Sequence, residues 1–350
     1  MKILFRHKRG LISFLILCGL YLIAIFSGFL APYHYETEQR LCSYSPPTKL
    51  HFIDSEGKFH FKPFIYNYSF KLDENRRRVY TEDKTKIYKS NFLTRGDKYK
   101  FLGFIPFDIH LFGVEEGGRF YLFGSDSRGR DLFSRILYGG RVSLSIGVIA
   151  VMITFSLGLI VGGVSGYFGG KVDAFLMRVC EMIMLVPSFY LLLALRASFP
   201  PEIGTVKIYF LIVIILSFIG WASLARVIRG IVLGLREKEF ILAARSIGLS
   251  DIKIIIKHIL PNTSSYTLVA ITLSIPGYIL GESALSLLGL GIQDPVPSWG
   301  NLLTDAMAIA QIKLHPWVLI PGFFIFLTVI AFNMLGDALR DIYDPKGRKI

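Results

Sequence analysis

Two glutamates lie inside long apolar segments of this sequence, and their carboxylates are the groups best placed to do chemistry. Glu282 falls within Tyr266–Leu288. Glu181 falls near the start of Phe175–Leu195. Because an ionised carboxylate is costly in lipid, each should face protein or water, where it can carry a proton, pair with a cation or line a solute pathway. Arg178 offers Glu181 a partner, whereas for Glu282 a helix-packing hydrogen bond and a place in a translocation pathway both remain open.

The motifs that usually carry catalysis are absent from the sequence. It has no GxxxxGK[ST] loop to hold a nucleotide, no HExxH and no GxSxG. The cysteines Cys18, Cys42 and Cys180 form no CxxC pair and no spacing typical of zinc ligands or of a disulfide framework. The sequence therefore predicts no catalytic residue, no metal site and no bound cofactor, so uphill transport would need energy from a partner.

A charged segment, Arg236–Asn262 (REKEFILAARSIGLSDIKIIIKHILPN), separates two apolar runs. Helical spacing separates the apolar residues of its first half: Phe240, Ala243, Ala244 and Ile247. A helix over Glu237–Ile247 should stop at Gly248, and Ser250 can cap a second, isoleucine-rich helix that ends at Pro261. The pattern predicts a knob of two short helices without a pocket. An amphipathic helix lying in the membrane interface is the alternative.

The apolar segments that flank these residues are long enough to span a membrane. The chain is 52% hydrophobic with a mean hydropathy of +0.50, more than is usual for a soluble protein. About 20 apolar residues cross the hydrocarbon core. Six segments qualify: Leu11–Leu30, Val142–Tyr167, Phe175–Leu195, Ile208–Ala225, Tyr266–Leu288 and Trp317–Gly336. The sequence therefore predicts an all-α membrane protein with six spans.

The basic residues orient these spans. The net charge is +13, and Lys and Arg gather in residues 1–10, 168–174, 226–265 and 337–350, besides one long polar segment. By the positive-inside rule these four segments are cytoplasmic, which places both termini and Arg236–Asn262 inside. A charge distributed in this way indicates contact with a lipid bilayer and argues against nucleic acid as a partner.

The long polar segment from Tyr33 to Gly140 is assigned to the outer side, since long loops translocate largely regardless of charge. Aromatic and polar residues alternate in DSEGKFHFKPFIYNYSF and in KYKFLGFIPFDIHLFG, which predicts short strands with one buried face. We expect a small, mainly β insert over residues 33–123. The run Arg76–Arg78 is predicted to be a solvated loop, and contact with a partner or a lipid headgroup is the alternative.

Glycine and proline mark further positions in and beside the spans. Four glycines recur at intervals of four residues along one helix face: Gly158, Gly162, Gly166 and Gly170. Such a series lets another helix approach closely. Pro187 should kink the third span, and it joins Glu282 as a candidate pathway residue. Leu288–Gly300 is predicted to be a surface or re-entrant turn, with Trp299 at the membrane interface.

Four ordered stretches resemble the C-type permease subunits of ABC importers for dipeptides, oligopeptides and nickel, the binding-protein-dependent transport system inner-membrane components. Ala243-Ala244-x-x-x-Gly248 followed by Leu260-Pro261 resembles their EAA loop. The other three stretches are Phe123–Gly147, Ala284–Leu303 and Pro321–Pro345. Leu242 and His258 depart from the general consensus, which has glutamate and isoleucine there. The similarity is dense over about 124–345 and leaves out the insert.

The resemblance implies a type I importer permease core. Its expected organisation is a cytoplasmic amino terminus with the first transmembrane helix (1–32), the insert (33–123), a core with five further transmembrane helices (124–345) and a cytoplasmic tail (346–350). It also implies that the loop couples to ATPases through nine residues: Glu239, Phe240, Ala243, Ala244, Gly248, Leu249, Asp251, Leu260 and Pro261.

The function that the resemblance implies is that of a non-catalytic permease subunit in the bacterial inner membrane, moving peptides or related small solutes. Its expected partners are a homologous second permease subunit, two cytoplasmic ABC ATPases that bind ATP and magnesium, and an extracytoplasmic binding protein. Two alternatives are a non-transporting scaffold with an outer partner-binding domain and a proton-driven transporter using Glu282.

Overall fold

The computed structural model describes residues 7–101, 104–187, 190, 191, 193, 194, 198 and 204–343. The chain forms two compact units. Unit 1 contains Met1–Leu17, Ser145–Leu285 and Leu327–Ile350, and unit 2 contains Cys18–Leu144 and Ser286–Phe326. The charged loop at 236–262 thus belongs to unit 1, and the insert belongs to unit 2.

Five helical segments within the described residues are long and apolar enough to cross a membrane: Lys8–Ile25, Leu132–Phe168, Thr205–Leu235, Asp251–Leu287 and Pro316–Tyr343. They contain the helices α1 (Lys8–Ile25), α3 (Leu132–Phe168), α6 (Thr205–Leu235), α9 (Ser264–Leu287) and α12 (Ile320–Tyr343). These segments correspond to five of the six predicted spans. The remaining one, Phe175–Leu195, begins on α4 (Gly170–Leu185) and runs on into residues that lie partly outside the described ones.

The predicted kink at Pro187 takes another form, because α4 ends at Leu185, before the proline. Val186 is extended, with φ −80° and ψ 119°. Proline disfavours the helical conformation of the residue that precedes it, so a helix commonly stops there. Pro187 therefore follows a helix end instead of bending a continuous helix, and its side chain is exposed.

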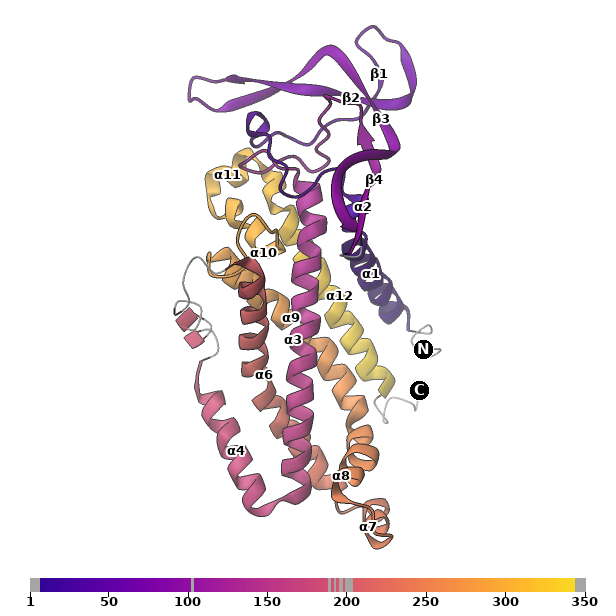
Figure 1. Cartoon of the computed structure of the whole chain (residues 1–350), viewed down its shortest axis with the longest axis vertical. Coiled ribbons are helices and arrows are strands. Elements are labelled where there is room, and N and C mark those ends of the chain that lie inside the picture. The colour runs from indigo at the N-terminus through magenta and orange to yellow at the C-terminus, as the bar shows by residue number, and fades with distance from the viewer. Residues whose placement is uncertain are drawn as a thin grey trace. The chain divides into compact units, whose positions relative to one another are not determined.

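The insert in unit 2 is an antiparallel sheet in the order β1-β2-β3-β4 (Figure 1). Its strands are β1 (His51–Ile53), β2 (Phe59–Leu72), β3 (Arg78–Phe101) and β4 (Ile105–Val114). The prediction of short strands is wrong for β2 and β3, which have 14 and 24 residues. Their length comes from irregular pairing, with register shifts after Tyr66 and after Arg95 that let each strand bend and continue.

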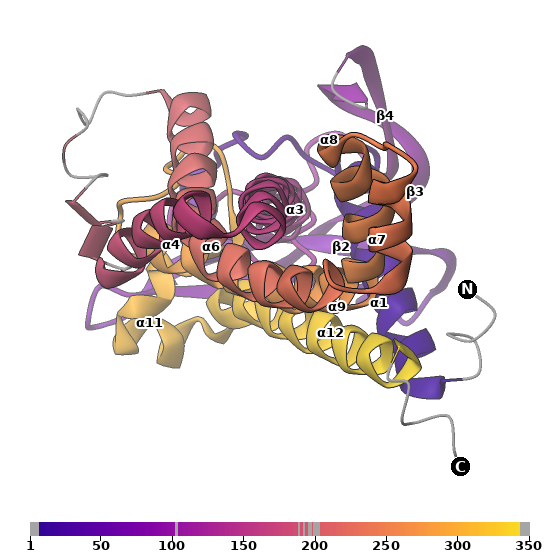
Figure 2. The ribbon, with the colours of Figure 1, turned by 90° about the horizontal axis from the view of Figure 1, so that it is seen from below.

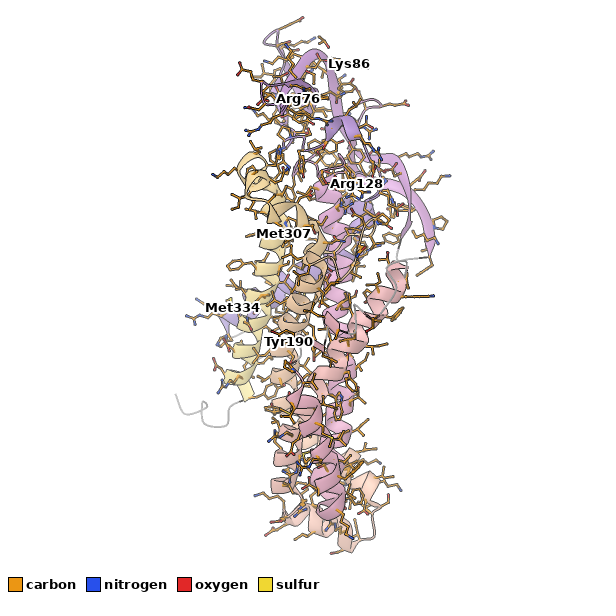
Figure 3. All side chains as sticks on the ribbon, turned by 90° about the vertical axis from the view of Figure 1, so that its left-hand side faces the viewer. Arg76, Lys86, Arg128, Tyr190, Met307 and Met334 are labelled. Atoms are coloured by element: carbon orange, nitrogen blue, oxygen red, sulfur yellow. The ribbon has the colours of Figure 1, made fainter. Side chains whose placement is uncertain are left out.

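The buried face of the sheet also differs from simple alternation. Phe64, Ile65 and Tyr66 are consecutive and all buried, immediately before the register shift in β2. The arginine run is divided: Arg76 and Arg77 lie in the exposed turn between β2 and β3, whereas Arg78 donates from Nη1 to the Arg40 carbonyl oxygen at 2.9 Å. Figure 3 labels Arg76 among the side chains of the sheet.

Short helices complete unit 2. They are α2 (Ser27–Leu30), α10 (Trp299–Leu302) and α11 (Ile309–Leu314), with 3₁₀ turns at Arg40–Cys42, Thr304–Met307 and Pro316–Leu319. Trp299, which was predicted to lie at the membrane interface, is buried within unit 2, and its Nε1 donates to the Ile136 carbonyl oxygen at 3.0 Å. Gly140 provides the space for the indole, since a Cβ there would lie 3.1 Å from the ring.

Candidate functional site

The charged loop of unit 1 folds as two short helices joined at a glycine. They are α7 (Glu239–Ser246) and α8 (Asp251–Ile254). Gly248 joins them with φ +77°, a conformation that side chains other than glycine rarely adopt. Its NH donates to the Arg245 carbonyl oxygen at 2.9 Å, closing the last turn of α7. Figure 2 shows α7 and α8 on one side of α3, with α4 on the other.

Two details of the predicted loop are wrong. Ser250 precedes α8 in an extended conformation, but its side chain makes no capping hydrogen bond. Pro261 does not end the second helix, because a π-helical turn (Ile255–Ile259) and a 3₁₀ turn (Leu260–Thr263) lead directly into α9. Such turns shift the hydrogen-bond pattern, so proline, which lacks an NH, can be accommodated without a break.

A tyrosine at the end of α3 holds the two loop helices together. The Tyr167 hydroxyl donates to Asp251 Oδ1 at 2.6 Å and accepts from Arg245 Nε at 3.2 Å. The Arg245 guanidinium also lies 4.8 Å from the centroid of the Tyr167 ring. The sequence analysis missed Tyr167, because it lies far along the chain from the loop and no spacing rule connects them.

The loop divides its apolar residues between an anchoring side and an outer side. Ile241, Ala244, Ile254, Ile255 and Ile259 are buried. The outer side, termed the apolar loop face below, consists of Phe240, Leu242, Ile247, Ile252 and Ile256, each at least 42% exposed. Among the other residues assigned to coupling, Glu239, Ala243, Asp251 and Pro261 are exposed, and Leu249 and Leu260 are half-buried. The buried residues thus anchor the loop, and the apolar loop face forms an exposed hydrophobic surface.

Three of the four spaced glycines lie where α3 meets α6. A Cβ on Gly158, Gly162 or Gly166 would come within 2.5–2.7 Å of atoms in α6. Gly170 stands apart, with φ +53° and no such neighbour within 4 Å. The close approach of two helix backbones at the first three positions is the arrangement that small residues permit inside membranes.

Gly162→Leu is expected to destabilise the protein by about 2 kcal/mol, because the new side chain would overlap the Ala225 carbonyl oxygen and the Ile228 side chain. Gly234→Leu in α6 is the matched control, since a Cβ there has no such neighbour within 4 Å. The measurement is the monodisperse fraction remaining after heating in detergent. Equal losses for the two variants would contradict the assignment of this seam.

A cavity of about 570 Å³ in unit 1 is bounded by α3, α6 and α9. Small and hydroxyl-bearing residues contribute to its wall, among them Thr154, Ser223 and Tyr278. The Tyr278 hydroxyl donates to Thr154 Oγ1 at 2.9 Å. Pro276, which the sequence analysis did not single out, lies inside α9 between wall residues. The described wall residues are uncharged, and some of them are polar.

The two glutamates of the predicted spans have different surroundings. Glu282 is fully buried in α9 beside Ser283, whose Oγ lies 3.5 Å from Glu282 Oε2. Its neighbour Gly281, and not Glu282 itself, is among the described residues that line the 570 Å³ cavity. Glu181 pairs with Arg178 at 3.2 Å, as predicted. The surroundings of neither glutamate identify it as part of a proton path.

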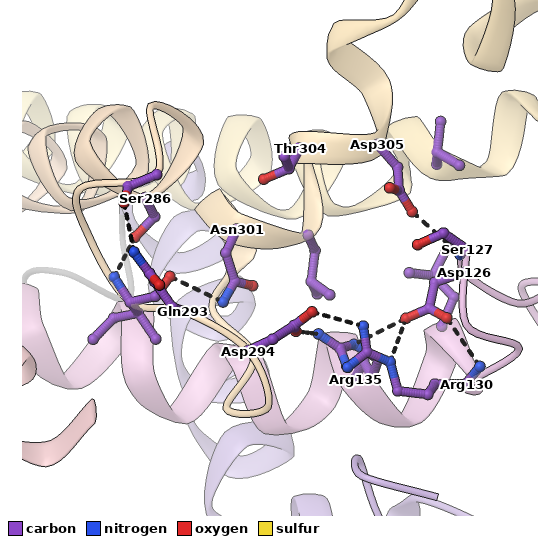
Figure 4. A pocket seen from close by; sticks show the side chains of 15 residues that line it. Asp126, Ser127, Arg130, Arg135, Ser286, Gln293, Asp294, Asn301, Thr304 and Asp305 are labelled. Carbon is purple, nitrogen blue, oxygen red and sulfur yellow. Dashed lines mark hydrogen bonds and ion pairs between the residues drawn. The ribbon is translucent and has the colours of Figure 1, made fainter. Parts of the chain in front are cut away.

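A cluster of ion-paired side chains in unit 2 connects the start of α3 to the loop after α9 (Figure 4). Arg130 pairs with Asp126 at 2.7 Å and with Asp294 at 3.0 Å. Arg135 pairs with Asp294 at 2.7 Å. These groups border a cavity of about 200 Å³ together with Asp305 and Asn301. The sequence analysis did not single out Asp294.

Burial and charge act in opposite directions on the carboxylates of this cluster. Burial would raise the pKa of Asp294, but the hydrogen bond from Arg130 and the charge of Arg135 lower it overall. Burial raises the pKa of Asp305, which accepts from the Ser127 NH at 3.3 Å. Asp294 is therefore the ionised centre of the cluster. Across the part of the chain that the structure describes, three or more potential ligands nowhere gather to hold a metal ion.

Residues 141–349 match the profile of the binding-protein-dependent transport system inner membrane components. This chain belongs to that family. The profile of the N-terminal transmembrane domain of oligopeptide transport permease C matches residues 1–47. Membership makes this permease a multi-pass inner-membrane protein and a non-catalytic component of a transport system. The two matches leave 48–140, and with it the sheet, outside both profiles.

Individual relatives are similar over the same portion of the chain. The dipeptide transport system permease protein DppC of Bacillus subtilis is 43% identical over 65% of this permease and 69% of its own length. The oligopeptide transport system permease protein OppC of Haemophilus influenzae is 44% identical over 65% and 71%. A solved inward-facing structure of the MetNI methionine ABC transporter aligns with 59% of this chain and 96% of its own, with 17% identity and a TM-score of 0.44.

Proposed function

We propose that this permease forms half of the translocation pathway of an ATP-driven importer for peptides or related small solutes. The observation that carries the proposal is the loop at 236–262, which combines buried anchors with the apolar loop face and holds no catalytic group. A surface of this kind suits docking to another protein. The names of relatives that carry dipeptides or oligopeptides support the class of solute.

The energy in this scheme comes from two cytoplasmic ABC ATPases, on which ATP and magnesium bind. Their closure on ATP would press on α7 and α8, and the tie through Tyr167 would pass that motion to α3. A homologous second permease subunit would supply the other half of the pathway, and a binding protein would deliver solute on the outer side. Both termini are cytoplasmic in this arrangement.

The organisation of the chain follows from the same proposal. Residues 1–32 would hold the cytoplasmic amino terminus and the first transmembrane helix, and 33–123 the extracytoplasmic insert. Residues 124–345 would form a type I permease core with five further transmembrane helices, before a tail at 346–350. The cavity whose wall includes Thr154 and Tyr278 is the candidate pathway, with Glu282 beside the wall residue Gly281.

Uptake by the complete complex in vesicles tests the proposal. Accumulation of a labelled dipeptide should require ATP inside the vesicle together with the binding protein outside, and it should survive a protonophore. Uptake that persists without ATP but disappears with the proton gradient would replace the proposal with a proton-driven transporter. ATP-dependent accumulation of another solute but no peptide would support ATP-driven import and refute peptides as the solute.

A further inference from the structure

The last hairpin of the sheet in unit 2, β3–β4, contacts the residues that follow α1. Asp97 Oδ2 accepts hydrogen bonds from the His34 NH at 2.8 Å and from Thr37 Oγ1 at 2.7 Å. A Cβ on Gly28 would overlap the ring of Tyr99. The rings of Phe26 and Phe101 lie 5.7 Å apart. The hairpin therefore has a defined position against the residues that follow α1 (Figure 1).

These contacts also set the direction of the hairpin. Tyr99 lies against Gly28 and Phe101 against Phe26, so β3 runs antiparallel to the chain that leaves α1. Phe101, the last residue of β3, therefore lies beside Phe26, the residue that directly follows α1. The described end of β3 thus reaches the level of the carboxyl end of α1.

The outer end of the span is marked independently. Arg141 donates from Nε to the Ala24 carbonyl oxygen and from Nη2 to the Ile25 carbonyl oxygen, each at 2.7 Å. A cation that satisfies the last carbonyls of a helix completes its carboxyl end. Arg141 thus locates the end of α1, and a guanidinium at this level is typical of the boundary between hydrocarbon and headgroups.

The tip of the hairpin is apolar and exposed. Phe104, Ile105 and Phe107 are 72%, 43% and 38% exposed. Leu22 and Ile25 on the adjoining end of α1 are exposed as well. Exposed apolar side chains next to the lipid-facing end of a span form a continuous surface with it, and such a surface is stable in the boundary layer of a bilayer.

Cations lie directly behind this apolar tip. Lys98 and Lys100 are exposed on β3 and, with Arg141, line a cavity of about 590 Å³ whose wall includes Tyr35 and Tyr138. Ammonium and guanidinium groups beside tyrosine rings at this depth match a lipid phosphate in charge and in hydrogen bonding. The apolar tip suits the acyl chains of a phospholipid, and the basic cavity suits its phosphate.

We propose that the tip formed by Phe104, Ile105 and Phe107 inserts into the leaflet in which α1 ends, and that Lys98, Lys100 and Arg141 bind the phosphate of a phospholipid there. The occupant is a membrane lipid, and the apolar tip and the two lysines of its site belong to the insert, which neither family profile matches. The site acts as an anchor that holds the sheet to the membrane surface.

Site-specific photocrosslinking tests the insertion. p-Benzoylphenylalanine replaces Phe104 in the full chain, assembled with its partners in phosphatidylglycerol-containing vesicles. The control replaces Phe61, which is 95% exposed on β2 of the same sheet. After illumination, mass spectrometry should find phospholipid adducts at position 104 in about tenfold excess over position 61. Adducts to another protein chain, or equal lipid labelling at both positions, would overturn the proposal.

Charge reversal tests the phosphate site. Lys98→Glu combined with Lys100→Glu should lower the phospholipid adduct at position 104 by about threefold or more. Lys84→Glu combined with Lys86→Glu is the matched control, because both of these lysines are exposed on the same strand. An equal decrease in both pairs, or no decrease in either, would refute binding of the phosphate by Lys98 and Lys100.

Discussion

Replacing Phe240 and Ile247 together by aspartate is expected to reduce copurification of the ATPase subunits by about tenfold or more and to abolish uptake. Both residues belong to the apolar loop face and are 42% and 76% exposed. Their substitution therefore removes little packing within this chain at Ile247 and only part of the packing at Phe240. Two carboxylates on a docking surface would instead have to be desolvated without a partner each time the ATPase binds.

Phe92→Asp is the control for this change, since Phe92 is an exposed phenyl group on β3 of unit 2. It should leave copurification and uptake unchanged. The yield and size-exclusion profile of each variant should match those of the parent protein. If the double variant still retained the ATPases and transported solute at the parental rate, the coupling role of the apolar loop face would be wrong.

The second large effect concerns the ion-pair cluster of unit 2. Asp294→Ala is expected to lower the free energy of unfolding by about 2–3 kcal/mol, because it leaves the buried guanidinium groups of Arg130 and Arg135 with less negative charge. The Asp294 side chain is 36% exposed, and solvent screening places the value below that of a fully buried pair. Thermal unfolding in detergent measures the change.

A double-mutant cycle separates this pairing from simple loss of contacts. Arg135→Met combined with Asp294→Ala should cost less than the sum of the single changes by about 1–3 kcal/mol, since the unpaired charge is gone. Asp305→Ala is the control in the same cavity and should cost under about 1 kcal/mol, because its hydrogen bond from the Ser127 NH is long, at 3.3 Å. Additive costs would show that Arg135 and Asp294 do not act as a pair.

The local rules that succeeded here depend on composition and short spacings. Apolar length predicted five segments that are helical, and Gly248 marked the joint between α7 and α8 correctly. The predicted helix end at Pro261 was wrong because a π turn and a 3₁₀ turn together continue the helical path. No spacing of residue types predicts such turns. The alternation in β2 failed at Phe64–Tyr66 for a related reason, the irregular register of its partner strand.

The residues that the sequence analysis missed are those whose roles depend on distant partners. Asp294 meets Arg130 and Arg135 across more than 150 positions of chain. Tyr167 meets Asp251 across 84 positions. Asp173 and Arg229 form a bidentate ion pair between α4 and α6 in the same way. Each of these residues is ordinary in its local sequence, so only the fold reveals the pairing.

The uninterrupted path from α8 into α9 has a mechanical consequence. Asp251–Leu287 is one helical run of 37 residues, about 55 Å of nearly inextensible rod at 1.5 Å per residue. A thrust applied at α8 would travel along this rod to Tyr278 at the cavity wall without relay through side chains. The turns at Ile255–Thr263 and Pro276 interrupt its regular hydrogen-bond pattern, so we expect any bending of this run to concentrate at these two places.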